Sequence, residues 1–208
     1  MTYLNVGSIT IPAVWIAIFI TLFITPLIYR ILYKKKVEDW YWNGFFFYIL
    51  VWKLSYIVFN LKMFLDMPLS IIYFNGGTKG NILGLAVLSF YLFFIAAKKY
   101  RSFYEHSAQI FLLYYIIYEA VVSLLEQKAI EGLCHSILLI GYLLLLYYLK
   151  KNKLRLSAQL FIVVFLSELM IMSIFSSFFS KVVLTFSWIG CTILIAFIKS
   201  NEEDTKLD

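Results

Sequence analysis

Seven apolar segments, each about as long as a membrane-spanning helix, occupy most of this chain and constrain its fold more than any other feature. A helix needs about 20 apolar residues to cross a hydrocarbon core of about 30 Å. The segments cover approximately residues 9–31, 43–61, 80–97, 108–125, 132–149, 156–175 and 181–198. The polar connectors between them are too short to hold a soluble domain. We therefore expect a single seven-helix transmembrane domain over residues 1–208, ending in a short tail at 200–208.

The amino-acid composition excludes a water-soluble globule. Hydrophobic residues make up 62% of the 208 residues and charged residues 14%, whereas a soluble domain has roughly 45–50% apolar and about 25% charged residues. The same composition argues against a disordered chain, a nucleic-acid-binding protein or a disulfide-linked scaffold. The predicted fold class is all-α: a polytopic membrane protein with seven transmembrane helices.

The basic residues are distributed unevenly between alternate connectors, and this sets the orientation of the helices. Thirteen of the 18 Lys and Arg residues lie on one side, four on the other, and Lys53 lies inside a segment. The thirteen are Arg30, Lys34, Lys35, Lys36, Lys98, Lys99, Arg101, Lys150, Lys151, Lys153, Arg155, Lys199 and Lys206. Because basic connectors stay in the cytoplasm, we expect the N-terminus outside and the C-terminus inside. The net charge of +6 then reports topology and not an acidic substrate.

The longest outer connector, residues 62–79, is apolar in its middle but too short there to span the membrane. We expect it to form an interfacial or re-entrant outer loop. The Asn-Gly-Gly sequence at 75–77 is typical of a tight turn, and Gly80 and Gly84 follow it at helical spacing. These glycines permit either close packing of the third helix on a neighbour or close approach of a ligand.

Three ionisable residues, Lys53, Glu119 and Glu168, lie near the middle of apolar segments. Each costs about 2.5–3.5 kcal/mol to insert and therefore needs a partner or a purpose. All three segments start from the cytoplasmic side, so the residues lie at similar depth and could meet. One interpretation is structural pairing of the lysine with a glutamate. The other is a polar cavity that holds a lipid headgroup or another anion.

A second polar group gathers at the outer ends of the segments. Its members are Asn60, Asp66, Asn75, Lys79, Asn81, Glu126, Glu131 and His135. His135 follows Glu131 by four residues, so the two share a helix face. Together with Glu126 they could form a proton-accepting set, although a lone histidine near an interface is also often a hydrogen-bonded structural residue. His106 lies in a cytoplasmic connector, where we expect it to be solvated.

The sequence offers no metal or cofactor signature. Two histidines at opposite membrane faces cannot share a metal, and Cys134 and Cys191 lie in apolar segments without ligand spacing, where we expect them to be small buried side chains. Neither a nucleophile-elbow motif nor a phosphate-binding glycine loop occurs. We therefore expect no metal and no cofactor.

Several ordered features of residues 6–100 resemble the prolipoprotein diacylglyceryl transferases, bacterial enzymes that transfer a diacylglyceryl group from phosphatidylglycerol to a lipoprotein cysteine. They are the opening VGSITI, Asp39 after a basic loop, the basic residue in WKLSYIVFN (52–60), Pro68-Leu69, the NGG at 75–77 and KGNILG at 79–84. The family also has seven spans with the N-terminus outside. The resemblance implies a bacterial cytoplasmic-membrane protein whose partners are a membrane phospholipid and a lipoprotein precursor or another envelope protein.

The resemblance breaks at the residues that carry the family's chemistry. Lys79 stands where the family has a catalytic histidine, and a protonated lysine cannot act as a base. The stretch YEAVVSLLEQKAIEG (118–132) lacks the arginine of the family's signature. The resemblance then implies that transferase activity is lost or rebuilt, with His135 and Glu126 or Glu131 as the candidate base. Together with the buried charges discussed above, the candidate lipid-binding residues are Lys53, Lys79, Asn75, Gly76, Gly77, Asn81, Glu119 and Glu168.

Two other functions remain open from the sequence. A non-catalytic membrane protein that binds lipids or envelope proteins would use the same cavity without turnover. A small transporter would use the charges near the middle of the membrane, but the chain shows no clear internal repeat and few Gly or Pro residues within its segments. The sequence leaves open whether the protein is an enzyme.

Overall fold

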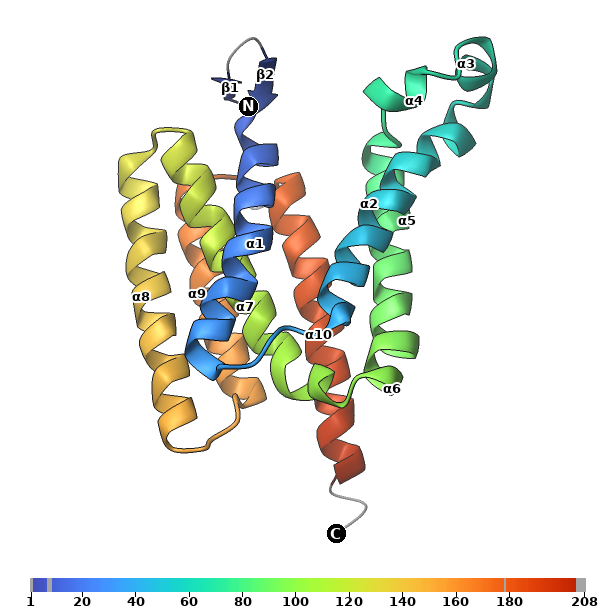
Figure 1. Ribbon diagram of the computed structural model, residues 1–208. Coiled ribbons are helices and arrows are strands. Elements are labelled where there is room, and N and C mark those ends of the chain that lie inside the picture. Colours follow the sequence, from blue (N-terminus) through green and yellow to red (C-terminus); the bar gives the residue numbers. More distant parts are fainter. Residues whose placement is uncertain (1, 7–8, 178, 205–208) are drawn as a thin grey trace.

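The computed structural model describes residues 2–6, 9–177 and 179–204. Within these residues, seven helices are long and apolar enough to cross a membrane, which confirms the predicted all-α polytopic membrane protein (Figure 1). They are α1 (Ala13–Tyr33), α2 (Asp39–Phe59), the continuous helix formed by α5 (Gly77–Phe90), the π-helical η1 (Tyr91–Ala96) and α6 (Ala97–Lys99), α7 (Arg101–Leu125), α8 (Ala129–Lys151), α9 (Ala158–Phe175) and α10 (Lys181–Asp204).

Helices are the expected form for these segments because hydrocarbon offers no hydrogen-bond partner to a peptide group, so each segment must satisfy its own backbone. Local signals set several helix ends. The hydroxyl of Ser157 accepts a hydrogen bond of 3.2 Å from the backbone N–H of Leu160 and caps the start of α9. Lys34 adopts the left-handed conformation, and its backbone N–H bonds to Arg30 to end α1.

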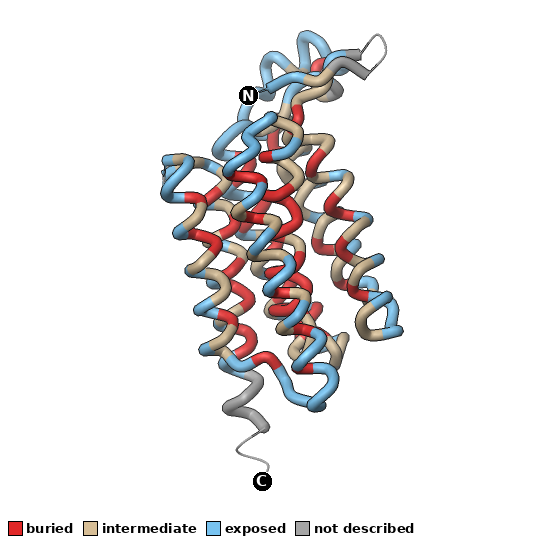
Figure 2. The backbone as a smooth tube through the Cα atoms, turned by 90° about the vertical axis from the view of Figure 1, so that its left-hand side faces the viewer, coloured by how far each residue is buried: buried red, intermediate tan, exposed pale blue. Residues whose placement is uncertain are grey.

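Helix α7 forms the centre of the bundle. It packs against α1, α8, α9 and α10, and 72% of its most apolar 18-residue window is buried. Helix α2 packs chiefly against α5, and in Figure 1 this pair leans away from the other five helices at the end that carries the N-terminus. Buried positions concentrate inside the bundle, and exposed positions cover its surface and ends (Figure 2). Large apolar side chains such as Ile137 and Phe23 are exposed on that surface, where a membrane would supply lipid.

The N-terminal hairpin and the end of α10 lie at opposite ends of the bundle (Figure 1), as an odd number of spans requires. The basic connectors lie at the end opposite the hairpin. We refer to the hairpin's end as the outer end, following the charge distribution. Residues 9–12 are a correction to the predicted first span. They form strand β2 (Ile9–Pro12), antiparallel to β1 (Tyr3–Val6), because the β-branched run that ends in proline favours a strand.

The outer connector contains two short helices, α3 (Leu61–Asp66) and α4 (Ser70–Tyr73). The third spanning helix begins at Gly77, which has a φ of +59° and donates its N–H to Asn75 Oδ1 at 2.9 Å. The turn predicted from the Asn-Gly-Gly sequence is therefore present, and the spanning helix starts directly within it.

The glycines after this turn serve helix packing. A Cβ on Gly76 or Gly80 would collide with Ser55 Oγ on α2, and one on Gly84 would lie 3.1 Å from the Tyr48 ring. Small residues at intervals of four let two membrane helices approach closely. Of the two functions open for these glycines, the structure supports close packing of α5 on α2.

Candidate functional site

A cavity of about 510 Å³ lies between the α2–α5 pair and helices α1, α7 and α10. Its volume is within the range of small-molecule sites, about 300–1,000 Å³. The residues that line it are Val14, Trp15, Ile18, Leu22, Trp40, Tyr41, Gly44, Phe45, Tyr48, Ile49, Trp52, Asn75, Asn81, Leu88, Leu92, Ser107, Ile110, Phe111, Tyr114, Tyr118, Lys181, Val182, Thr185, Phe186, Ile189 and Ile193. Most of this surface is apolar or aromatic.

The cavity is long in the direction of the helices. Along α2 its lining runs from Trp52 near the outer end to Trp40 near the inner end. Twelve residues of helix correspond to about 18 Å, slightly more than half of a hydrocarbon core of about 30 Å. Because Lys181, at the outer start of α10, also lines it, the cavity extends over most of the length of the bundle.

The polar groups of the cavity are concentrated toward its outer part. Tyr48 donates a hydrogen bond from its hydroxyl to Asn81 Oδ1, and Asn81 Nδ2 donates to Thr185 Oγ1 at 3.3 Å. Asn75, at the turn before α5, and the exposed Lys181, at the first position of α10, lie further out. An apolar channel with amide donors and one ammonium group at its outer end matches an amphipathic anion.

Two seams join the α2–α5 pair to the remaining helices. On one side, the indoles of Trp15 and Trp52 stack at 5.4 Å between ring centroids, and Tyr41 donates a hydrogen bond of 3.1 Å to the carbonyl of Leu22. On the other side, Ser89 on α5 lies 3.0 Å from Thr192 on α10 and accepts a hydrogen bond of 2.9 Å from the Trp188 indole. These polar and aromatic contacts lie on either side of the cavity. Between them the helices do not pack closely, so the cavity stays open.

A separate cluster of ionisable residues lies on another side of α7, among α7, α8 and α9. His135 Nδ1 approaches Glu168 Oε1 to 2.8 Å, and both side chains are fully buried. The carboxyl group of Glu119 is also buried, with its residue 2% exposed. Glu119 lies at a depth similar to that of His135 and Glu168, and its helix α7 packs against both α8 and α9. The three side chains therefore form one buried acidic cluster, which we call the Glu119–His135–Glu168 cluster.

This cluster changes the pairing expected from the sequence. The structure shows a different partner for one of the glutamates, since Glu168 pairs with His135. Lys53 is half-buried on α2, and α2 packs against α5. Position along the helices gives Lys53, Glu119 and Glu168 similar depth, but it did not predict that His135 pairs with Glu168.

The loop between α7 and α8 holds the other members of the expected base. Lys128 Nζ pairs with Glu126 at 2.9 Å and with Glu131 at 3.5 Å. Partial burial alone would raise the pKa of Glu126, but the hydrogen bond and charge of Lys128 outweigh it and lower that pKa. The hydrogen bond to Glu126 raises the pKa of Lys128. Lys128 thus binds both carboxylates.

The remaining candidate lipid-binding residues are divided between the cavity and the α2–α5 pair. Asn75 and Asn81 line the cavity. Gly76 and Gly77 form the turn that contacts α2, where Gly76 N–H bonds to the Trp52 carbonyl at 3.1 Å and the Trp52 indole donates to Gly77 O at 3.2 Å. Lys79 is exposed, with its ammonium 5.8 Å from the centre of the Phe59 ring. Glu119, Glu168 and His135 are absent from the described lining of the cavity.

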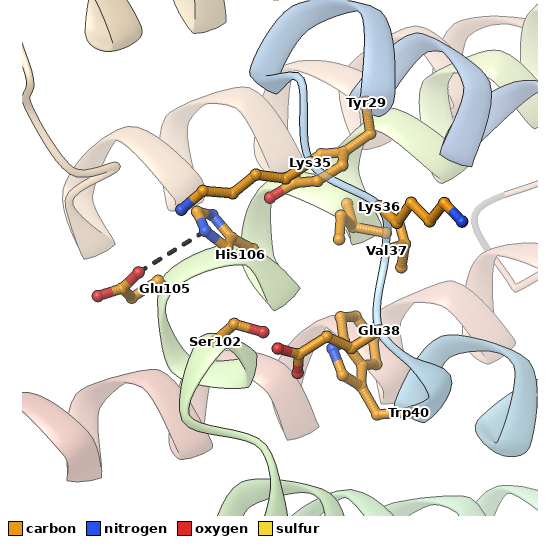
Figure 3. Close-up of a pocket in the computed structure, with 10 residues that line it drawn as sticks. Tyr29, Lys35, Lys36, Val37, Glu38, Trp40, Ser102, Glu105 and His106 are labelled. Atoms are coloured by element: carbon orange, nitrogen blue, oxygen red, sulfur yellow. Dashed lines mark ion pairs between the residues drawn. The ribbon is translucent and has the colours of Figure 1, made fainter.

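A second, smaller pocket of about 120 Å³ lies at the inner end, between the α1–α2 connector and the start of α7 (Figure 3). His106 lines it, 3.6 Å from Glu105 and packed on the rings of Tyr29 and Tyr33. In Figure 3 the side chain of Lys35 extends toward His106. The expectation of a solvated His106 was therefore wrong, because α7 begins earlier than predicted and carries it against α1.

Sequence reasoning also missed residues that the cavity uses and misplaced one cysteine. Tyr48, Thr185 and Lys181 line the cavity, but each looks ordinary in sequence, as a residue inside or at the start of an apolar segment. Cys191 is exposed at the bundle surface, in contrast to the expected burial, whereas Cys134 is partly buried.

Comparison of the chain with family models, with curated proteins and with solved structures finds no match.

Proposed function

We propose that this protein is a multi-pass protein of the bacterial cytoplasmic membrane that binds an anionic phospholipid, with one acyl chain in the cavity and the headgroup at its outer end. The observation that carries this proposal is the shape of the cavity, which runs along most of the bundle and is apolar along most of its length. An acyl chain fills such a channel without leaving polar groups unpaired.

The outer end of the cavity supports an anionic headgroup. Lys181 supplies the charge, and Asn75 and Asn81 supply amide groups at the same end. A basic residue near the membrane surface attracts an anionic lipid by about 1 kcal/mol. The resemblance to the diacylglyceryl transferases favours phosphatidylglycerol as the lipid.

The geometry favours binding without the family's transfer reaction. A thiol that attacks a glyceryl carbon needs a base, because the thiolate is the nucleophile. His135, the candidate base, pairs with Glu168 in the Glu119–His135–Glu168 cluster, and Glu126 and Glu131 bind Lys128. None of the three is among the described residues that line the cavity.

A cavity-filling substitution tests the proposal. Ile189→Trp places a large ring in the cavity, whereas Ile195→Trp on the same helix lies at the exposed surface and serves as the matched control. We expect purified wild-type protein and Ile195→Trp to retain phospholipid in native mass spectrometry, and Ile189→Trp to lose most of it. Equal lipid retention by Ile189→Trp and Ile195→Trp would overturn the proposed site.

Two further measurements define the ligand and the chemistry. In nanodiscs, Lys181→Gln should weaken binding of phosphatidylglycerol about fivefold relative to phosphatidylcholine, the factor that about 1 kcal/mol produces. Lys151→Gln, at the inner end, should leave that preference unchanged. Incubation with phosphatidylglycerol and a lipoprotein signal peptide should release no glycerol phosphate. If the wild type releases glycerol phosphate and the Ile189→Trp variant does not, the protein is a transferase and the proposal of binding alone is wrong.

A further inference from the structure

The Glu119–His135–Glu168 cluster is a feature that lipid binding leaves unused. Glu119 lies six residues before the outer end of α7, His135 six residues after the outer start of α8, and Glu168 seven residues before the outer end of α9. At about 1.5 Å per residue, all three lie about 9–10 Å inside the bundle. Three helices thus bring ionisable groups together at one depth, in the outer half of the membrane.

The cluster is incompletely satisfied. Both ring nitrogens of His135, both oxygens of Glu168 and Oε1 of Glu119 are buried without an aligned hydrogen bond. His135 and Glu168 lie at ion-pair distance, 2.8 Å, but at an angle that does not direct an N–H at the carboxylate. A buried polar group without a partner costs about 1–3 kcal/mol, and more when it is charged. Buried polar groups that lack a partner despite this cost are typical of functional sites.

Charge balance indicates what the cluster holds. With both carboxyl groups ionised and a neutral imidazole, it would carry two negative charges in a low-dielectric interior, which is strongly unfavourable. Two protons make it neutral. We assign one of them to the His135–Glu168 pair, whose atoms approach to 2.8 Å, and the other to Glu119. Among the described residues, no group of three or more His, Cys, Asp or Glu side chains is placed to hold a metal ion.

Other groups that face the cluster leave this balance unchanged. Tyr115, one turn from Glu119 on α7, presents a buried hydroxyl. Helix α10 contributes the Phe186 ring, stacked on Tyr115 at 4.2 Å. Helix α1 contributes buried threonine hydroxyls to the bundle, Thr21 and Thr25. The nearest lysine is that of the α7–α8 loop, which already pairs with two carboxylates.

Polar side chains lead from the cluster toward the outer end. Glu131 lies one turn before His135 on α8 and reaches the loop lysine, Lys128, while the buried hydroxyl of Ser123 lies one turn after Glu119 on α7. The two helices touch at this level, since a Cβ on Gly132 would lie 3.6 Å from Ser123 Cβ. Toward the inner end, the fully buried apolar residues Leu112, Leu113 and Ile116 follow on α7.

We propose that Glu119, His135 and Glu168 form a proton-binding site that exchanges protons with the outer side of the membrane through Glu131. In its resting state Glu119 is protonated and neutral, and His135 is an imidazolium paired with the Glu168 carboxylate. The site is distinct from the lipid cavity, which another side of α7 lines through Phe111, Tyr114 and Tyr118.

Infrared spectroscopy of the reconstituted full-length protein tests the assignment of the protons. The carbonyl stretch of a protonated buried carboxyl group should be present in the wild type and absent in Glu119→Gln. It should rise about twofold in His135→Gln, because without the imidazolium Glu168 must also be protonated to stay neutral. Glu126→Gln, at the surface, should leave the band unchanged. A band that is absent from the wild type, or that is insensitive to Glu119→Gln and His135→Gln, would overturn the proposal.

A second measurement leaves the cluster intact, in case its variants do not fold. The chain contains two histidines, so ¹⁵N-histidine labelling of His106→Gln reports His135 alone. We expect a doubly protonated ring at neutral pH, as the ion pair with Glu168 requires. A neutral ring throughout would contradict the proposed state. After a rapid pH jump, the infrared band of Glu131→Gln should respond more slowly than that of Glu105→Gln at the inner end, and equal rates would exclude the outer route.

Discussion

At the scale of single residues, glycines decide how α2 and α5 pair. Gly80 faces Ser55 Oγ and lies where an added Cβ would be 3.2 Å from the Trp52 carbonyl oxygen. Because backbone atoms cannot move aside cheaply, Gly80→Ala should lower the free energy of unfolding by about 1–3 kcal/mol, the usual cost of overpacking. Thermal unfolding in detergent measures this. Gly141→Ala on α8, where nothing lies within 4 Å, should not destabilise the protein. Equal unfolding temperatures for the two variants would refute the packing role of Gly80.

At the scale of elements, the α7–α8 loop is held by Lys128 between Glu126 and Glu131. The pKa of Glu126 is lowered in the folded state, so its contribution to stability is present above its unfolded pKa of about 4.3 and is lost as the pH falls through the folded value. The pKa of Lys128 is raised, so its contribution is present below about 10.4 and is lost as the pH rises through the folded value.

The size of this effect follows from exposure. The Lys128 side chain is 47% exposed, and partly exposed ion pairs contribute about 0–1 kcal/mol. Lys128→Met should therefore remove at most about 1 kcal/mol near neutral pH, and the difference from the wild type should shrink in acid below the folded pKa of Glu126. Denaturant titrations at several pH values measure this difference. A difference that stays constant into acid would show that Glu126 is not the partner that matters.

At the scale of the whole molecule, seven spans and the charge asymmetry predict opposite sides for the connectors. In a variant without Cys134 and Cys191, a thiol introduced by Lys79→Cys should react with a membrane-impermeant maleimide on intact cells. One introduced by Lys151→Cys should react only after permeabilisation. Both positions are exposed, so burial would not prevent either reaction. The reverse labelling pattern would invert the topology and place the Lys181 end of the cavity on the cytoplasmic side.

The sequence was informative wherever a property depends on local composition. The hydropathy of each segment predicted all seven spans, and the Asn-Gly-Gly turn was placed correctly before the third. The hydropathy-based prediction of the first span was wrong at residues 9–12, where pairing with another strand overrides hydropathy. For the candidate site, the sequence found the two buried glutamates and His135 as unusual residues, but it did not predict that His135 pairs with Glu168.

The sequence by itself determined that this chain crosses the membrane seven times, because the cost of leaving peptide groups and charges in hydrocarbon acts on each segment separately. Position along a helix also fixed the depth of every ionisable residue. Only the tertiary structure decided which of them meet and where space remains, because rotation of a helix about its axis and the lean of α2 and α5 depend on contacts between distant segments. The cavity beside α7 and the Glu119–His135–Glu168 cluster both arise from those contacts.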